Sequence, residues 1–536
     1  MSDLALPALA SDAAPEFVDV ASCKEWLGHL PLANVAASQR ELLGQLREFN
    51  RYASKAAGRL AALEALREAV HFVQIEQAKR FSNRALPMVE AETAVFNDTI
   101  DLWEQMRLGY LRCVETAAAG EGGMRAQTGL VCQRTLGYSG LKMFHHHRAY
   151  RQVPPCEWRA LHEVYARAEV LGAAEDRVMD YLNRDVNETS PRIAYVRALL
   201  MGLCNPNELS QRQLSFVANL LERWGDKITV SPQAADDADL PPLAVDLAGE
   251  SSAERGAAVA GEARYLDTRR LAKSLRNRIG LLRTGESPAK LALGEDCVQP
   301  SCEQLLVFLY RKWCQGKPPR VAERRLVTDA AQACNGMAAI HYHISGRPFR
   351  QPGERKELSQ KQRDELATFG RIGTRDDDDY GRVHGLDIED WQLQDESAQG
   401  LRMRRGPGSP GKRFTHGQLV VVRPGDAKNF MLAQVRWLSS GESNDLNAGL
   451  KLLPGLPAAT AVRPTGLNVT HAEYVQALSL TAVPALNSPP TLVLPAGWYK
   501  PNRVIEVYVE APVRVRLTAM VERGSDFERV AYEILP

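Results

Sequence analysis

The hexapeptide Asp395-Glu-Ser-Ala-Gln-Gly400 combines three side-chain chemistries at a fixed spacing, D-x-S-x-x-G. An Asp carboxylate can bond its own backbone in an Asx-turn, and a Ser hydroxyl can donate or accept a hydrogen bond. Gly can adopt φ > 0 and let a ligand approach the main chain. The segment therefore predicts a polar turn at the edge of a sheet, with groups that a ligand can reach.

Short β-type runs follow this hexapeptide. They span residues 418–423, 431–437 and 448–453, and the turn sequences Pro424-Gly-Asp and Ser440-Gly-Glu separate them. Apolar and β-branched runs bounded by Gly and Pro are typical of short antiparallel strands. We therefore expect a small β-barrel in this part of the chain.

The stretch from about residue 320 to 453 resembles a PilZ domain, a family of six-stranded barrels whose better-known members bind cyclic di-GMP. In that family a D/N-x-S-x-x-G motif acts with an R-x-x-x-R motif that precedes the first strand. Asp395, Ser397 and Gly400 match the first motif without a gap, and Gly449-Leu-Lys-Leu matches the usual end of the domain. The resemblance implies that these residues contribute to a nucleotide site.

Two sequences could supply the arginine motif. Arg371 and Arg375 lie at the more ordinary distance from the hexapeptide, but the four aspartates 376–379 follow at once and would neutralise them. The other candidate is Arg320 with Arg324. Both pairs stay open as candidates.

We favour Arg320 and Arg324 because a β-rich run, 338–345, follows them as a first strand should. Choosing them requires an insertion at about 347–387. That interval is typical of one, since it holds a Pro/Gly/charged loop, a short helix at 359–368 and the acidic run.

Cyclic di-GMP offers two phosphates and the guanine acceptors O6 and N7, which guanidinium groups bind in pairs of hydrogen bonds. The resemblance implies this role for Arg320 and Arg324. Asp395 could accept from the guanine N1 or N2 donors, while Ser397 and the backbone at Gly400 close the other side. The alternative is that the arginines are solvated and the hexapeptide is an ordinary turn.

Composition limits the remaining possibilities. A chain of 536 residues predicts two to four domains, and a net charge of +1 excludes a global basic field for nucleic acid. Locally, 401–420 holds five Arg/Lys and no acidic residue. Nine scattered cysteines, no signal-peptide features and no apolar run of membrane-span length predict a protein of the reducing cytoplasm, without disulfide framework or membrane span.

The first half of the chain shows helical periodicity. Apolar residues recur with a helical period over 35–81, and a second long helix over 87–119 suggests an antiparallel hairpin. Trp158, Leu161 and Tyr165 resemble the first helix of a tetratricopeptide repeat, but no second copy occurs, so we favour a generic helical hairpin that binds proteins. Further helices are expected at 155–171, 173–183, 191–203, 210–224, 265–282 and 301–314.

Motifs for catalysis or metal binding are weak. His145-His-His147 looks like a metal cluster, but adjacent residues point in different directions and do not easily share one ion. Cys297, Cys302 and Cys314 lack zinc-site spacing, and no phosphate-loop, nucleophile-elbow or zinc-protease motif occurs. We expect no enzyme activity, no metal and no cofactor.

These observations predict an α+β multidomain protein: an all-α N-terminal half, a PilZ-like antiparallel barrel and a further β unit. Its function would be that of a cyclic di-GMP effector whose helical domain contacts a protein partner. The alternative is a scaffold or chaperone-like protein with a structural barrel. The expected parts are a disordered tail at 1–20, a helical domain at 21–230, a linker at 231–263, a helical segment at 264–315, the barrel at 316–460 and the last β unit at 461–536.

Overall fold

A computed structural model describes the chain from residue 6 to 536, except 122, 184–185, 236–239, 257–258, 260, 295–296, 299–300, 317–323, 354–379, 442, 444 and 467–471. The chain divides into two compact units. The first comprises Met1–Arg84 with Met88–Pro319, and the second comprises Ala85–Pro87 with Arg320–Pro536. The two units are described separately.

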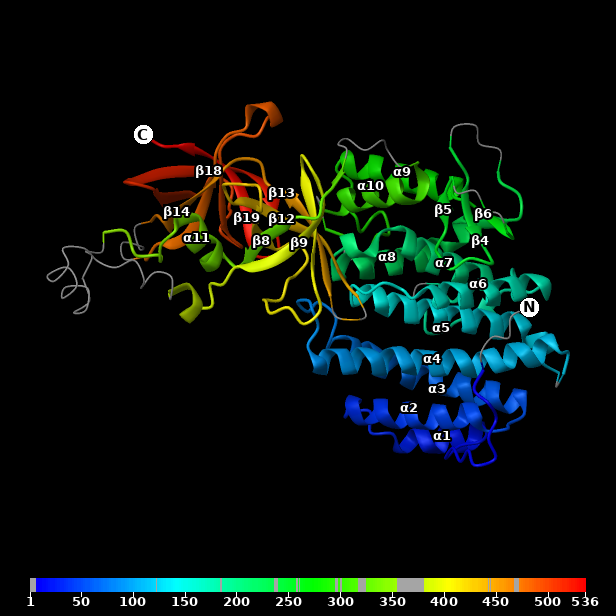
Figure 1. The fold of residues 1–536 in the computed structure, drawn as a ribbon. Helices are drawn as coiled ribbons and strands as arrows, with labels where there is room; N and C mark the ends of the chain where they lie inside the picture. The colour runs from blue at the N-terminus through cyan, green and yellow to red at the C-terminus, as the bar shows by residue number, and fades with distance from the viewer. Residues whose placement is uncertain are drawn as a thin grey trace. The chain divides into compact units, whose positions relative to one another are not determined.

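The first unit is mainly helical, and Figure 1 shows its helices layered in roughly chain order from blue to green. They share one core in which Trp103, Tyr110 and Trp313 are almost fully buried. The α-helices are α1 (Val20–His29), α2 (Val35–Arg51), α3 (Ala56–Ala78), α4 (Glu90–Ala118), α5 (Thr128–Arg148), α6 (Pro155–Val170), α7 (Pro191–Leu203), α8 (Gln211–Trp224), α9 (Arg269–Arg283) and α10 (Ser301–Cys314). The predicted all-α character of this half is confirmed in outline.

The long helix expected over 35–81 is two helices, α2 and α3. Tyr52 is extended at the end of α2, and the Arg59 guanidinium donates to the carbonyls of Phe49 and Tyr52 at 2.9 and 2.7 Å. These bonds satisfy carbonyl groups that a helix end leaves without partners. Because apolar spacing continues through the break, periodicity alone could not locate it.

Two other expectations in the first unit are wrong. No helix spans 173–183, because Gly172 adopts φ +71° after α6 and the chain then forms β1 (Val178–Met179), paired with β2 (Glu188–Thr189). Within the expected tail, the described residues are ordered in the core: Phe17 is fully buried and packs on the ring of Phe49 at 5.1 Å.

The segment 231–263, expected to be a linker, instead contributes strands to a four-stranded sheet in the order β3-β6-β4-β5. Leu243 and Val245 on β4 are buried in the helical core. The strands are β3 (Thr229–Ser231), β4 (Leu243–Asp246), β5 (Glu254–Arg255) and β6 (Ala263–Asp267).

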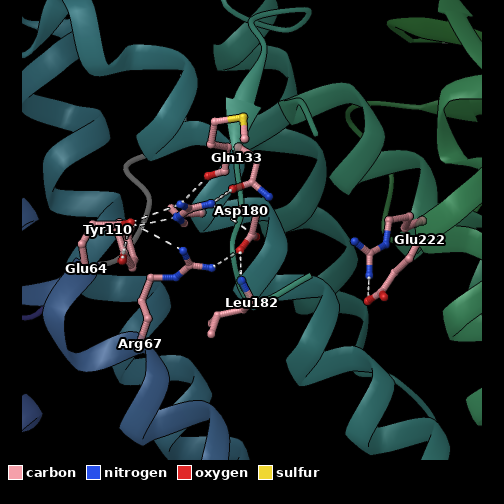
Figure 2. A network of polar contacts seen from close by, with 10 residues as sticks. Glu64, Arg67, Tyr110, Gln133, Asp180, Leu182 and Glu222 are labelled. Carbon is pink, nitrogen blue, oxygen red and sulfur yellow. Dashed lines mark hydrogen bonds and ion pairs between the residues drawn. The ribbon is translucent and has the colours of Figure 1, made fainter. Parts of the chain in front are cut away.

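A buried polar network connects α3, α4, α5 and β1 in the first unit (Figure 2). Arg134 donates to both oxygens of Glu64 at 2.9 and 3.1 Å, and Arg67 donates to Asp180 at 2.6 Å. Tyr110 donates to Glu64 at 2.6 Å. Burial alone would raise the pKa of Glu64, but hydrogen bonding and the charges of Arg134 and Arg67 lower it.

The first barrel of the second unit is a ring of antiparallel strands in the order β9-β10-β13-β12-β11-β8, closed because β10 pairs with both β9 and β13. β7 adds to the outer edge of β9. This confirms the predicted antiparallel barrel. The strands are β7 (Arg325–Leu326), β8 (Ala330–Asn335), β9 (Glu389–Ser397), β10 (Gly400–Arg405), β11 (Leu419–Pro424), β12 (Met431–Ser440) and β13 (Leu446–Leu452).

The run 338–345 is not the first strand of this barrel. It lies in helix α11 (Met337–Ser345). The strand in question is β8, just before this helix, and the β-rich composition of 338–345 led us to expect the strand there instead. Gly336 and Gly346, both with positive φ, flank the helix. Ile340 is fully buried between the two barrels, so tertiary packing overrides the strand preference of the run.

The last β unit is a second closed barrel with strand order β14-β15-β16-β19-β18-β17. It shares a core with the first barrel, in which Leu419, Val421 and Leu432 pack with Leu478 and Phe527. The strands are β14 (Pro457–Pro464), β15 (Val475–Leu480), β16 (Thr491–Pro495), β17 (Val504–Tyr508), β18 (Pro512–Arg523) and β19 (Phe527–Ile534).

Two further observations concern the chain as a whole. Among the residues described, no helix combines the length and apolarity that crossing a bilayer requires. Cys297 and Cys302 form a disulfide with a Cα–Cα distance of 4.9 Å, a bridge that the scattered cysteines did not predict.

Candidate functional site

The D-x-S-x-x-G hexapeptide forms the hairpin between β9 and β10. Asp395 lies within β9, where its side chain accepts a hydrogen bond from Arg324, the residue before β7, so the expected Asx-turn is wrong. The Ser397 hydroxyl donates to the Gly400 carbonyl at 3.2 Å and closes the hairpin. The motif therefore sits at one end of the barrel strands, a position we call the rim.

Gly400 has a role different from the one its sequence suggested. It does not adopt a positive φ. A Cβ at this position would instead lie 2.6 Å from the carbonyl oxygen of Leu450 on β13. The glycine is needed because the two strands approach closely there, which is required for the barrel to close.

Arg324 is brought to the hexapeptide by β7. β7 pairs with β9 in a register that sets Leu326 opposite Asp395. Arg324 lies two residues before Leu326, so its side chain is close enough to contact Asp395. Its Nη1 donates to Asp395 Oδ1 at 2.6 Å, and the neighbouring Arg325 pairs with Glu396 at 2.6 Å. Arg320, like Arg371 and Arg375, lies outside the described residues.

The rim contains a second arginine that the sequence did not single out. Arg402 on β10 is opposite Asp395, with its Nη1 4.0 Å from Asp395 Oδ2. Its guanidinium carbon lies 6.0 Å from the ring centroid of Trp437 on β12. Gly449 of β13 stands opposite both residues in the sheet register, so one row crosses four strands.

Gly449 explains how the row fits together. A Cβ there would lie 1.8 Å from Trp437 Nε1, so the indole occupies the space that a side chain would need. The missing side chain lets the indole lie between its own strand and β10, within reach of Arg402. The result is an aromatic surface beside the Arg402 guanidinium.

The electrostatic balance of the rim favours an anion. The side chain of Asp395 is only 9 % exposed, while those of Arg324 and Arg402 are 47 % and 46 % exposed. One largely buried carboxylate therefore orients two cations whose outer N–H groups remain in contact with solvent. Guanidinium groups held in this way can bind phosphate or a guanine edge.

A cavity of about 390 Å³ is lined by residues of β8, β9 and β10 that include Asp390, Trp391 and Arg404. None of the matched motif residues lines it. We place the candidate site at the rim rather than in this cavity, because two arginines share Asp395 at the rim, whereas Arg404 pairs with Asp445.

The structure thus brings together Arg324, Asp395, Ser397 and Gly400, as predicted, with Arg320 outside the part described. Arg402 and Trp437 were missed. The available signal was the basic run 401–420, which contains Arg402, but its loop composition suggested a solvated hairpin.

The described residues contain no group of three or more metal-ligating side chains that could hold an ion. His145, His146 and His147 are buried in α5; His145 lies beside Trp103 and His146 beside Phe96.

Comparisons with known proteins point to one class at both ends of the chain. Residues 21–235 match the family described as the N-terminal domain of the cyclic-di-GMP receptor FimW. Residues 460–535 match the family described as the FimW C-terminal β-barrel domain. The chain therefore resembles the FimW receptors in its helical part and in its second barrel, and the first barrel lies between the matched ranges.

A relative from Pseudomonas aeruginosa, the cyclic-di-GMP receptor FimW, is 25 % identical to this chain. The similarity covers 90 % of this chain and 84 % of the relative. It therefore extends across the first barrel as well as the two matched domains.

Proposed function

We propose that this protein is a cytoplasmic cyclic di-GMP effector whose ligand binds at the rim of the first barrel, which we assign to the PilZ type. The observation that carries the proposal is the Arg324–Asp395–Arg402 arrangement, in which one buried carboxylate orients two half-exposed guanidinium groups. The similarity to receptors named for this ligand supports it.

Different residues of the rim could bind the phosphates, the guanine edges and the base faces of cyclic di-GMP. Arg324 and Arg402 would bind a phosphate or the O6 and N7 acceptors of guanine, and Arg320 would add a further cation. Asp395 can exchange part of its ion pairing for the guanine N1 or N2 donors. Trp437 offers an apolar face on which a base can stack, a contact worth about 1–3 kcal/mol.

Ligand binding would also affect the connection between the two units. α10 ends in a fixed position of the helical unit, because Trp313 is fully buried and its indole donates to the Leu200 carbonyl at 2.9 Å. Arg324 lies eleven residues after Trp313 in the chain and belongs to the second unit. A ligand that binds both Arg320 and Arg324 would restrain this connection and so change how the helical unit meets a protein partner.

Calorimetry with the intact protein tests the proposal. Cyclic di-GMP should bind saturably, and more weakly at high salt, because added ions screen phosphate–guanidinium attraction. GMP at the same concentration serves as the control, since it offers one phosphate and one base. Absence of binding at tens of micromolar ligand would leave only the scaffold interpretation, with a purely structural barrel.

A further inference from the structure

Three residues from the region between α3 and α4 are part of the barrel unit, although the rest of that region belongs to the helical unit. Leu86 and Phe414 exchange two backbone hydrogen bonds, both of 2.7 Å, in an antiparallel bridge. The Nε of Arg413 donates to the Ala85 carbonyl at 2.8 Å. We call Ala85–Pro87 the docking tripeptide.

The docking contact is well buried. Leu86 is 2 % and Phe414 is 1 % exposed. Phe414 lies in the loop between β10 and β11, and Asn335 of β8 donates to the adjacent Arg413 carbonyl at 2.9 Å. Because the backbone amides of Leu86 and Phe414 are hydrogen-bonded and both side chains are buried, the docking tripeptide is packed against the barrel.

A set of contacts connects this attachment to β9 and β10, the two strands that form the rim. Phe414 meets the ring of Trp391 edge-on at 5.2 Å, and the Arg405 guanidinium lies 5.3 Å from that ring. Arg405 donates to Glu389 at 2.6 Å, and both side chains are at most 5 % exposed. Glu389 also accepts from the Lys412 backbone, so it holds the loop against β9.

The same two strands carry the rim. Trp391 is four residues before Asp395 on β9, and Arg405 is three residues after Arg402 on β10. A ligand that binds Asp395 and Arg402 would restrain β9 and β10, which carry Trp391 and Arg405. It would therefore also restrain the surface on which Leu86 docks.

On its other side the tripeptide is close in sequence to a fixed residue of the helical unit. Phe81 is 2 % exposed and packs on Phe96 at 5.4 Å and on His145 at 6.2 Å. Leu86 follows Phe81 by five residues, so this connection can span at most about 18 Å.

We infer that the docking tripeptide couples the rim to the helical unit, so that a ligand at the rim strengthens docking of Leu86 on Phe414. This rests on the proposed function. Linkage is reciprocal, so docking must strengthen ligand binding by the same factor.

Two measurements on the full-length protein test the inference: calorimetry with cyclic di-GMP, and hydrogen exchange of the Leu86 amide with and without that ligand. Leu86→Ala should weaken cyclic di-GMP binding by about 5-fold or more, the lower end of usual couplings. In the wild-type chain, the ligand should slow exchange of the Leu86 amide by a comparable factor. Val89→Ala is the matched control, because Val89 is close by in the chain and 47 % exposed.

Arg413→Met provides a second variant if Leu86→Ala fails to fold. It keeps an apolar stem and removes the hydrogen bond to Ala85. Folded docking variants with unchanged affinity, or ligand that speeds exchange at Leu86, would overturn the inference and leave the proposed function intact. Wild-type protein that binds no cyclic di-GMP would overturn both.

Discussion

The helical unit and the first barrel both bring arginines to carboxylates, but they do so in opposite environments. In the helical network Arg134 is 3 % exposed and its guanidinium donates to Gln133, Glu64 and the Met179 carbonyl. At the rim, Arg324 and Arg402 are about half exposed and share one carboxylate.

This difference separates a structural role from a binding role. A buried arginine whose donors are all engaged has nothing left for a ligand, and its removal leaves charges without partners. A half-exposed arginine contributes little to stability and keeps donors free. The number of Arg–carboxylate pairs is therefore uninformative, and the burial of each partner shows which pairs are candidates for ligand binding.

Acidification should destabilise the helical unit most. Burial is the main cause that lowers the pKa values of His145, His146 and His147 to about 3, 4 and 3, and the charges of Arg148 beside His145 and of Lys142 beside His146 contribute to these values. Below the unfolded pKa of about 6.5, the unfolded chain binds protons that the folded chain does not. Stability should be full above pH 6.5 and fall by about 2 kcal/mol for each histidine by pH 5.

Urea unfolding followed by far-ultraviolet circular dichroism at pH 7.5 and 5.0 measures this loss. His147→Asn should reduce the pH dependence, whereas the exposed His29→Asn should leave it unchanged. Equal stability at the two pH values would show that these histidines are not buried as neutral groups.

Breaking the helical network should cost slightly less. Arg134→Met leaves Glu64 and Asp180 to share Arg67, and removal of one partner from a buried ion pair typically costs about 3–5 kcal/mol. The control is Arg177→Met, since Arg177 is 79 % exposed in its pair with Glu188 and should change stability by less than about 0.5 kcal/mol. Similar effects of the two changes in urea unfolding would remove the distinction between the two regions.

The rim should show the converse behaviour. Arg320→Ala, Arg324→Ala and Asp395→Ala should each weaken cyclic di-GMP binding by about 1–3 kcal/mol, the scale of a lost charge-assisted contact. Arg324→Ala should change stability by less than about 0.5 kcal/mol, because its side chain is half exposed. Calorimetry paired with urea unfolding measures both. A large loss of stability with unchanged affinity would make the rim a structural site.

Trp437 should have a smaller effect. Trp437→Ala removes the face on which Arg402 lies and should weaken cyclic di-GMP binding by about 1 kcal/mol. Trp437→Phe keeps an aromatic face and should retain most of the affinity in calorimetry. If Phe is as damaging as Ala, the indole acts by filling the space over Gly449 rather than by stacking.

The smallest effect should come from the second arginine pair. Arg371→Ala and Arg375→Ala should change affinity by less than about 0.5 kcal/mol, because the aspartates that follow neutralise them. Losses in calorimetry as large as those of Arg324→Ala would move the site to these residues.

Element types were predictable where the pattern was long or its boundaries were marked. The helix at 301–314 coincides with α10, which carries the helical period over its length, and the run 418–423 agrees with β11 to within one residue, because it is apolar and is followed by a Pro-Gly turn. The run 338–345 failed because short apolar segments fit either period, and burial between two barrels decided the outcome.

The candidate site was predictable only in part, for a physical reason. Asp395, Ser397 and Gly400 are neighbours in sequence, so a motif finds them. Arg402 and Trp437 meet through register across β10, β13 and β12, and no linear spacing records that register. For Gly400, the motif found the residue, but the close approach of its strand to β13 was not predicted.

The core shared by the two barrels limits how the molecule can be divided. Ending the chain near residue 455 would expose Leu419, Val421 and Leu432 to water, since their packing partners include Leu478 and Phe527 of the second barrel. The first barrel would then expose an apolar patch to solvent and tend to aggregate. The rim and the C-terminal barrel should accordingly be inherited and lost together, and insertions that separate them should be tolerated poorly.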